Sequence, residues 1–217
     1  MPKAVVFGEI GFAWIAFVGY GFNFWTPPFF QRQHGVSVSE AGIILGLCGA
    51  VAGWLGVSGG GILSDRLRLT RPRARLELGM ATAIISGPLA FMLVQSESVT
   101  MAYVFNFIYQ LFSAFWIGSA VALANELVVP RMRATASAYY ILAVTFIGLA
   151  LGPYTVGQIS DRLAKAGATG GHALGTAMKW SLLAYGIGLI FLFVSSRFVE
   201  RDEASRLDRA RALGEPV

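Results

Sequence analysis

The sequence GILSDRL at residues 61–67 returns as GQISDRL at residues 157–163. Each copy closes a long apolar stretch, and these stretches are the second and the fifth of six along the chain. The second and fifth of six membrane helices run in opposite directions, so we expect the two copies on opposite faces of the membrane. Two three-helix units related by an inverted repeat produce this arrangement. The pattern predicts an all-α integral membrane protein with six transmembrane helices arranged as a 3+3 inverted repeat.

The composition is also typical of a chain that lies mostly in lipid. Hydrophobic residues make up 55% of it and charged residues 13%, with a mean hydropathy of +0.62, whereas about 25% of residues are charged in soluble domains. Each apolar stretch approaches or exceeds the roughly 20 residues that a helix needs to cross the hydrocarbon core. We therefore expect a six-helix membrane bundle over residues 1–198 and a charged cytoplasmic tail over residues 199–217. The predicted helices lie near residues 4–30, 41–63, 76–94, 101–127, 134–159 and 176–198.

Lys and Arg are distributed unequally between the two sides of this predicted bundle. Of the 17 basic residues, 13 fall in the N-terminus, the second and fourth connections and the C-terminal tail, and 4 fall on the other side. Positive-inside bias then predicts a multi-pass protein of the cell (inner or plasma) membrane with both termini in the cytoplasm. Membrane lipids are expected partners because anionic headgroups attract these residues. No nucleic-acid partner is predicted.

Glycine recurs at helical spacing along the second predicted helix and, over a shorter run, along the fifth. Burial of apolar surface gives little net drive in lipid, so helix association relies on the close backbone contact that small residues permit. We interpret both faces as helix-packing seams. They consist of Gly42, Gly46, Gly49, Gly53, Gly56 and Gly60 in the second helix and Gly148 and Gly152 in the fifth.

Polar side chains line one face of the first helix and one face of the fourth. Such groups are costly inside a membrane and usually face the bundle interior or a wet cavity. Because the two helices run in opposite directions, a rise of about 1.5 Å per residue places Asn23 and Asn106 at a similar depth. We predict a substrate cavity here, and the alternative is that the amides only bond across helices as structural contacts. The candidate cavity residues are Tyr20, Asn23, Asn106, Gln110, Ser113 and Trp116.

Glu9 is a separate candidate, for proton coupling. It lies about one helical turn inside the cytoplasmic boundary and has no cationic partner in its own helix. Ionisable residues within membrane spans are rare and are often functional. The alternative for Glu9 is that its carboxyl group only reaches the interfacial water.

The repeated heptapeptide supplies a candidate conformational latch. A carboxylate at the end of a helix can accept hydrogen bonds from the N-terminal amides of another helix, and the helix dipole favours this contact. If the helix that donates these amides moves, the contact can open and close, as a latch does. The arginines of the motif are open to another interpretation, in which they only set the orientation in the membrane. The candidate latch residues are Gly61, Asp65, Arg66, Asp161 and Arg162.

One stretch matches a catalytic motif. Residues 56–60, GVSGG, fit G-x-S-x-G and also the G-x-S-G of six-helix intramembrane serine proteases. Such a serine needs a histidine within hydrogen-bond reach. Ser58 falls in the cytoplasmic third of its helix, whereas His34 and His172 fall in connections on the opposite side. We therefore predict no enzyme activity, and with Cys48 as the single cysteine and no ligand cluster we predict no metal and no cofactor.

Taken together, these residues resemble the major facilitator superfamily, and specifically the C-terminal six-helix half of its members. Gly61-x3-Asp65-Arg66, followed by Arg71 and Arg73, resembles the superfamily's loop motif G-x3-D-[RK]-x-G-x-[RK]-[RK], with an arginine at position 68 in place of glycine. The stretches at 130–138 and 148–161 resemble the Spinster-like branch. The resemblance implies half of a major facilitator fold, transport by alternating access and a cavity lined by the first and fourth helices. It also implies lipids, lysolipids and other amphipathic substrates, often with proton coupling.

Members of this superfamily have two six-helix halves, and this chain has one. We therefore expect a half-length secondary transporter, or a fragment of one, that moves a small or amphipathic small-molecule substrate, lipid-like molecules included. Its expected partner is a complementary N-terminal six-helix half or a second copy of itself. The alternative is a non-transporting membrane subunit that binds another membrane protein through its glycine-rich helix faces.

Overall fold

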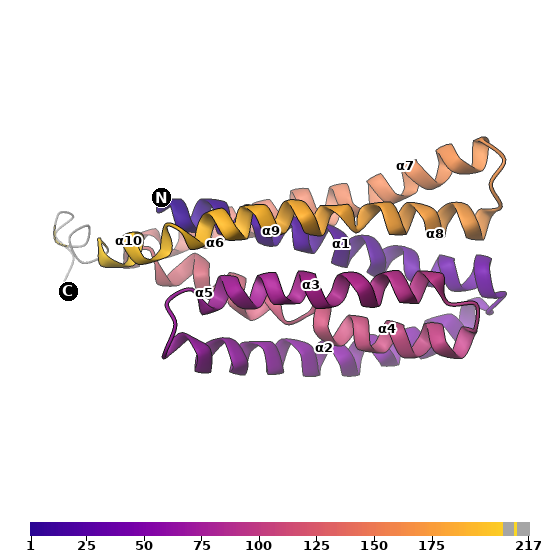
Figure 1. The fold of residues 1–217 in the computed structure, drawn as a ribbon, viewed down its shortest axis with the longest axis horizontal. Helices are drawn as coiled ribbons and strands as arrows, with labels where there is room; N and C mark the ends of the chain where they lie inside the picture. The colour runs from indigo at the N-terminus through magenta and orange to yellow at the C-terminus, as the bar shows by residue number, and fades with distance from the viewer. Residues whose placement is uncertain (206–210, 212–217) are drawn as a thin grey trace.

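The computed structural model describes residues 1–205 and Arg211. These residues form an elongated bundle of helices (Figure 1), six of which are long and apolar enough to cross a membrane. The prediction of an all-α membrane protein with six spans is confirmed. Of the predicted tail at 199–217, only residues 199–205 and 211 are described, and the rest lies outside the described residues. The six spans are Lys3–His34, Val38–Arg68, Ala74–Gln95, Val99–Glu126, Pro130–Lys165 and Gly170–Ser196.

The first three spans are the single helices α1 (Lys3–His34), α2 (Val38–Arg68) and α3 (Ala74–Gln95). Gly35 ends α1 in the left-handed conformation, at φ 67°, which glycine adopts without steric cost. Two residues later Ser37 caps α2, and its hydroxyl accepts a hydrogen bond of 3.2 Å from the Glu40 amide. This short turn reverses the chain between the first two spans.

The fourth and sixth spans are each interrupted, although the sequence predicts one helix for each. The fourth consists of α4 (Val99–Ser113) and α5 (Trp116–Glu126), and the sixth of α8 (Gly170–Ser181) and α9 (Leu183–Ser196). The hydroxyl of Ser113 donates to the Gln110 carbonyl at 3.2 Å, and that of Ser181 donates to the Met178 carbonyl at 2.7 Å. A serine that bonds back to a carbonyl about one turn earlier bends a helix. Each interruption therefore follows directly after such a serine.

The fifth span contains a π-helical segment. It runs through η1 (Pro130–Met132), α6 (Arg133–Ala143), the π-helical segment η2 (Val144–Leu151) and α7 (Gly152–Lys165). Pro153 lies in the first turn of α7, where a missing amide hydrogen costs little. A π segment is often found at functional sites. The short helix α10 (Val199–Ala204) follows the sixth span.

The first span is the centre of the bundle, and the second and fifth lie at its edges. α1 packs against α9, η2, α7 and α8, and α2 packs mainly against α4 and α5. Within the apolar part of each span, 67% of the residues are buried for the first but only 22% for the second and fifth. The two heptapeptides end these two exposed spans at opposite ends of the bundle (Figure 1). The fold is thus a 3+3 inverted repeat.

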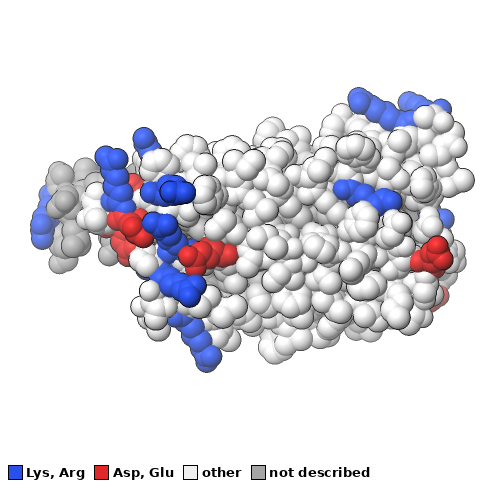
Figure 2. All heavy atoms as spheres, in the orientation of Figure 1, with Lys and Arg blue, Asp and Glu red and all other residues white. Residues whose placement is uncertain are grey.

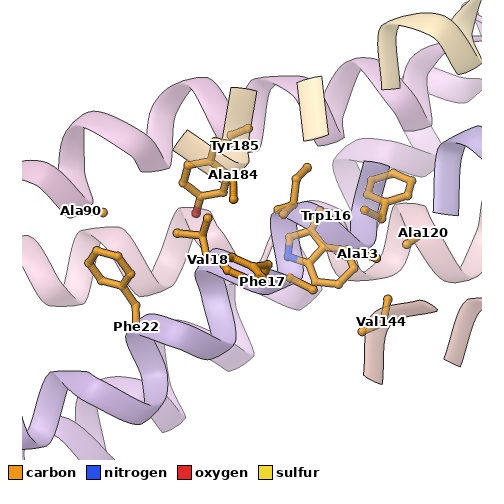
Figure 3. Packing of buried hydrophobic residues seen from close by; sticks show 14 of the residues in the cluster. Ala13, Phe17, Val18, Phe22, Ala90, Trp116, Ala120, Val144, Ala184 and Tyr185 are labelled. Carbon is orange, nitrogen blue, oxygen red and sulfur yellow. The ribbon is translucent and has the colours of Figure 1, made fainter. Parts of the chain in front are cut away.

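Aromatic pairs join α1 to the fourth span. In the close view of the core, Phe17 and Val18 lie between Phe22 and Trp116 (Figure 3). Along α1 the residue numbers of the pairs rise while those on the fourth span fall, so the two spans are antiparallel. Paired residues therefore lie at similar depth. The pairs are Phe12 with Trp116 at 5.8 Å, Phe22 with Tyr109 at 5.2 Å and Phe30 with Tyr103 at 4.5 Å between ring centroids.

Candidate functional site

Two neighbouring pockets lie between α1, α2 and the fourth span. One has a volume of about 320 Å³ and the other of about 340 Å³. Asn23, Gly49 and Gln110 line both of them. Because the pockets share these residues, we treat them as one groove and refer to them together as the groove.

All six candidate cavity residues line the groove. The first pocket contains Asn23, Asn106 and Gln110, and the second contains the others together with Asn23 and Gln110. α1 and the fourth span therefore contribute facing walls at similar depth. The sequence reasoning missed the third wall, which comes from α2. The other candidates, in the second pocket, are Tyr20, Ser113 and Trp116.

Four glycines of α2 form this third wall. A Cβ added at Gly42, Gly46 or Gly53 would meet no other atom within 4 Å, and at Gly49 it would lie 2.9 Å from Oε1 of Gln110. The prediction that Gly42, Gly46 and Gly53 are packing contacts is therefore wrong within this chain. The groove separates α2 from the fourth span here, and the missing side chains keep it open.

The other glycines of the two faces do allow close contact between helices. A Cβ at Gly60 would lie 2.5 Å from the Phe115 carbonyl oxygen, and one at Gly56 would overlap the Leu111 carbonyl oxygen. On the fifth span, a Cβ at Gly148 would lie 2.8 Å from the Ala16 Cβ. A Cβ at Gly152 would overlap the Phe17 carbonyl oxygen. The closest backbone contacts of α2 with the fourth span therefore lie at Gly56 and Gly60, beyond the groove.

The groove is polar without being charged. Its lining contains amides, hydroxyl groups and aromatic rings, and it contains no Lys, Arg, Asp or Glu among the described residues. Asn106 is only 1% exposed, and its Nδ2 has no hydrogen-bond partner within the described part of the chain. A concave site of mostly apolar surface with a few placed polar groups is typical of small-molecule binding. This lining suits a ligand with apolar surface and uncharged hydrogen-bonding groups.

Glu9 lies outside the groove and is fully buried. It is 0% exposed, and neither carboxylate oxygen has a hydrogen-bond partner among the described residues. Tyr139 and Tyr140 of α6 are close enough to interact with it electrostatically. The alternative that Glu9 reaches interfacial water does not agree with this burial.

The candidate latch residues are not brought together. Asp65 forms an ion pair of 3.0 Å with Arg75 of α3 rather than capping another helix, and a Cβ at Gly61 would meet nothing within 4 Å. Arg75 also donates to the Ser64 hydroxyl at 2.8 Å and binds Glu126 of α5 through two nitrogens. The sequence reasoning missed Arg75, whose signal was an arginine at the start of an apolar span. The remaining latch residues form no ion pair with other described residues: Arg66, Asp161 and Arg162.

Charged side chains gather at the end of the bundle where α1 begins and α9 ends (Figure 2). Ion pairs there join the end of α2 and the connection between α2 and α3 to α10. Arg68 binds Glu203 at 2.6 Å, and Arg73 binds Glu200 at 3.0 Å. The Ala4 amide also donates to Asp202 at 2.8 Å. α10 is thus fixed against both the start of α1 and the connection between α2 and α3.

The protease-like motif lacks its partner. Ser58 lies in the last third of α2, toward Arg68. His34 ends α1 and His172 lies in the first turn of α8, and both of these are at the opposite end of the bundle. Neither histidine can reach Ser58 in this fold.

A family profile and individual protein sequences both match this chain, and they indicate the same superfamily. The family profile described as Major Facilitator Superfamily matches residues 3–153. The chain is 30% identical over 193 residues to an MFS-type efflux pump of Mycolicibacterium smegmatis, which covers 88% of this chain and 44% of that protein. It is 35% identical over 174 residues to Protein spinster homolog 1 of Homo sapiens, which covers 73% of this chain and 33% of that protein.

A solved structure agrees with these matches. The crystal structure of a bacterial homolog to the human lysosomal transporter Spinster, in an inward-facing and unoccupied conformation, is similar with a TM-score of 0.80 and 26% sequence identity. The similarity covers 93% of this chain and 49% of that one. The chain therefore spans about half the length of that structure and less than half of the two curated relatives.

Proposed function

The chain belongs to the major facilitator superfamily, in its Spinster-like branch, and we propose that it is one half of a secondary transporter in which the groove forms one wall of the substrate path. Alternating access requires two bundles that rock about a shared site. This chain supplies one such bundle, so the second comes from a complementary six-helix half or from another copy of the chain. We assign the chain to the position of the C-terminal half.

The observation that carries this proposal is the groove itself. Three spans line it, its wall on α2 is kept open by glycine, and its polar groups come from α1 and the fourth span. Asn106 has a buried donor with no partner among the described residues, which a ligand can satisfy. Trp116 adds an aromatic side chain to the lining of the second pocket. We infer a small or amphipathic substrate, lipid-like molecules included, whose recognised part carries no net charge.

The partner is expected on the exposed face of α2. Leu47 is 64% exposed and Trp54 is 70% exposed on this helix, beside the open glycines of the groove. A second six-helix body placed there would cover these side chains and close the groove from lipid. The same face also favours a second candidate function, a non-transporting subunit that binds another membrane protein through α2.

We propose that both termini lie in the cytoplasm and that the membrane is the cell membrane. The basic residues gather at the end where the chain begins (Figure 2), and positively charged connections are retained on the cytoplasmic side. The opposite end, with His34 and His172, then faces outward. A protease site engineered into the connection between α2 and α3 would be cut only from the cytoplasmic side.

The substrate proposal is tested with a photoactivatable lysophosphatidylcholine in membranes that contain the chain. We expect label on peptides of α1 and α4 that unlabelled lysophosphatidylcholine competes away. Asn106→Leu should weaken the competition about tenfold, as expected for the loss of one buried hydrogen bond of about 1.4 kcal/mol. The matched control, Gly186→Val on an open face of α9, should leave it unchanged. Label spread evenly over lipid-facing helices, without competition, would contradict the proposal.

The need for a second bundle is tested by cross-linking from α2. Trp54→Cys, in a background lacking Cys48, is treated with a short bifunctional thiol-to-amine reagent in the native membrane. We expect one cross-linked product, either with a second membrane protein of at least six spans or with another copy of the chain. We also expect vesicles made from the same membrane to transport lysophosphatidylcholine. A single partner without any transport would favour the subunit function instead. A chain that forms no product would contradict both functions.

A further inference from the structure

Glu9 is the one buried carboxylic acid among the described residues, and nothing there balances its charge. The side chain is 0% exposed and both oxygens lack a hydrogen-bond partner. Burying an ionised carboxylate without a partner is far more costly than burying the neutral acid. In this conformation the carboxyl group therefore carries a proton.

The elements packed against α1 offer no cation to Glu9. On α6, Tyr139 and Tyr140 interact with it, and both are neutral phenols; Arg133 begins the same helix but forms no ion pair with Glu9. η2 contains no titratable residue, and Tyr185 on α9 faces Tyr109 instead.

The remaining charges are engaged elsewhere, are exposed or lie far along the bundle. On α10, Glu200 and Glu203 bind Arg73 and Arg68, Asp202 accepts from the Ala4 amide, and Arg201 is exposed. On α2, α3 and α5, Arg75 binds both Asp65 and Glu126. On α1 itself, the ammonium group of Lys3 lies over the Phe198 ring, 5.6 Å from its centroid. The charged residues of α7 and α8 lie toward the opposite end of the bundle: Asp161, Arg162, Lys165, His172 and Lys179.

The helix that covers Glu9 is built to move. Of the residues of α6, only Ala136 and Ala143 are buried. The Trp25 indole of α1 donates a hydrogen bond of 2.8 Å to the Pro153 carbonyl, which fixes the start of α7. The π-helical segment η2 lies between this fixed point and the tyrosines over Glu9. A hinge at η2 would therefore lift α6 from Glu9 while α7 stays attached to α1.

We propose that Glu9 is a proton-binding site whose occupancy is linked to the position of α6. The site is protonated while α6 packs over it, and it releases the proton when α6 swings away about η2 and admits water. Proton binding and the closed position of α6 thus favour each other, as reciprocal linkage requires. The coupling of this proton to a substrate rests on the proposed transport function, but the linkage itself does not.

Infrared spectroscopy of the chain reconstituted in ether-linked phosphatidylcholine membranes, whose lipids have no ester carbonyl group, tests the site. A protonated carboxyl group has a carbonyl stretching band that an ionised carboxylate lacks, and exposed Asp and Glu are ionised at neutral pH. We expect such a band at neutral pH in the unmodified protein and its loss in Glu9→Gln. The control Glu97→Gln removes an exposed carboxylate and should leave the band unchanged.

A measurement on the unmodified protein makes the result independent of any variant. In D2O the band should shift to lower frequency only slowly, because the buried group exchanges when α6 opens. Absence of the band at neutral pH, or its survival in Glu9→Gln, would overturn the proposal. Neither outcome bears on the proposed function of the groove, because lysophosphatidylcholine labelling tests that function separately.

The linkage to α6 is tested by a wedge in the fifth span. A Cβ at Gly148 would lie 2.8 Å from the Ala16 Cβ, so Gly148→Val should push this span from α1. We expect Glu9 to ionise at a pH about one unit lower than in the unmodified protein, a tenfold weaker affinity for the proton. Gly186→Val, at a position with open space, should not shift it. An unchanged titration in Gly148→Val would refute the linkage.

Discussion

The indole Nε1 of Trp25 donates a hydrogen bond of 2.8 Å to the carbonyl oxygen of Pro153. It joins the central span to the exposed fifth span directly after the π segment. The Trp25 ring also packs closely on α7, because a Cβ at Gly157 would lie 2.9 Å from the ring. The fifth span is therefore attached to α1 by one specific polar contact and by glycine-mediated packing.

Replacement of Trp25 tests this attachment. Trp25→Phe keeps an aromatic ring but removes the donor, so the free energy of unfolding in detergent should fall by about 1 kcal/mol. The matched control is Trp54→Phe, which changes an indole that is 70% exposed and should have little effect. Equal losses in the two variants would show that the hydrogen bond contributes nothing specific.

Arg75 should be the most sensitive position of the charged end. Its side chain is only 8% exposed and binds Asp65 and Glu126, so Arg75→Met removes a buried guanidinium that binds two carboxylates and should cost about 3 kcal/mol. Arg71→Met removes a surface ion pair with Glu77 at 3.7 Å and should cost no more than about 1 kcal/mol. Thermal unfolding in detergent at one ionic strength compares the two. A smaller loss for Arg75→Met than for Arg71→Met would contradict the network described here.

The two classes of glycine on α2 should respond oppositely to alanine. At Gly60 a Cβ would lie 2.5 Å from the Phe115 carbonyl oxygen, so the backbones must separate and Gly60→Ala should destabilise the protein by about 2 kcal/mol. At Gly53 the added methyl group meets open space, and the better helix propensity of alanine should stabilise the protein by up to about 1 kcal/mol. Unfolding in detergent, where the chain is studied alone, checks both. Destabilisation of equal size would mean that the groove is closed in solution.

The architecture could be predicted because hydrophobic length and helical spacing determine it directly. Six apolar stretches gave six spans, and the facing depths of Asn23 and Asn106 followed from antiparallel helices with a fixed rise per residue. The interruptions could not be predicted from hydropathy, because Ser113 and Ser181 act through a hydrogen bond to a local carbonyl. A polar hydroxyl in the middle of an apolar span was the available signal.

The tertiary role of individual residues was less accessible. The helical spacing in the sequence places the glycines of this face of α2 together. It does not determine at which of them the neighbouring helix is close and at which it is distant. Gly60 therefore contacts a backbone while Gly53 lines the groove. Asp65 was expected to meet another helix end, but Arg75, only ten residues away, is closer in space and binds it at 3.0 Å. Both outcomes depend on the packing of three spans together.

The central claim is that the groove is a wetted path rather than a lipid-filled seam. Cysteine accessibility tests it directly, because a thiol ionises and reacts only where water reaches it. In the native membrane, where the partner bundle is present, and in a chain that lacks Cys48, Gln110→Cys lies in the groove, and Ile190→Cys lies on an exposed face of α9. We predict that a charged, membrane-impermeant methanethiosulfonate reagent labels Gln110→Cys at least about tenfold faster than Ile190→Cys, as expected for a thiol in water rather than in hydrocarbon. Equal labelling of the two, or none at Gln110→Cys, would contradict the account.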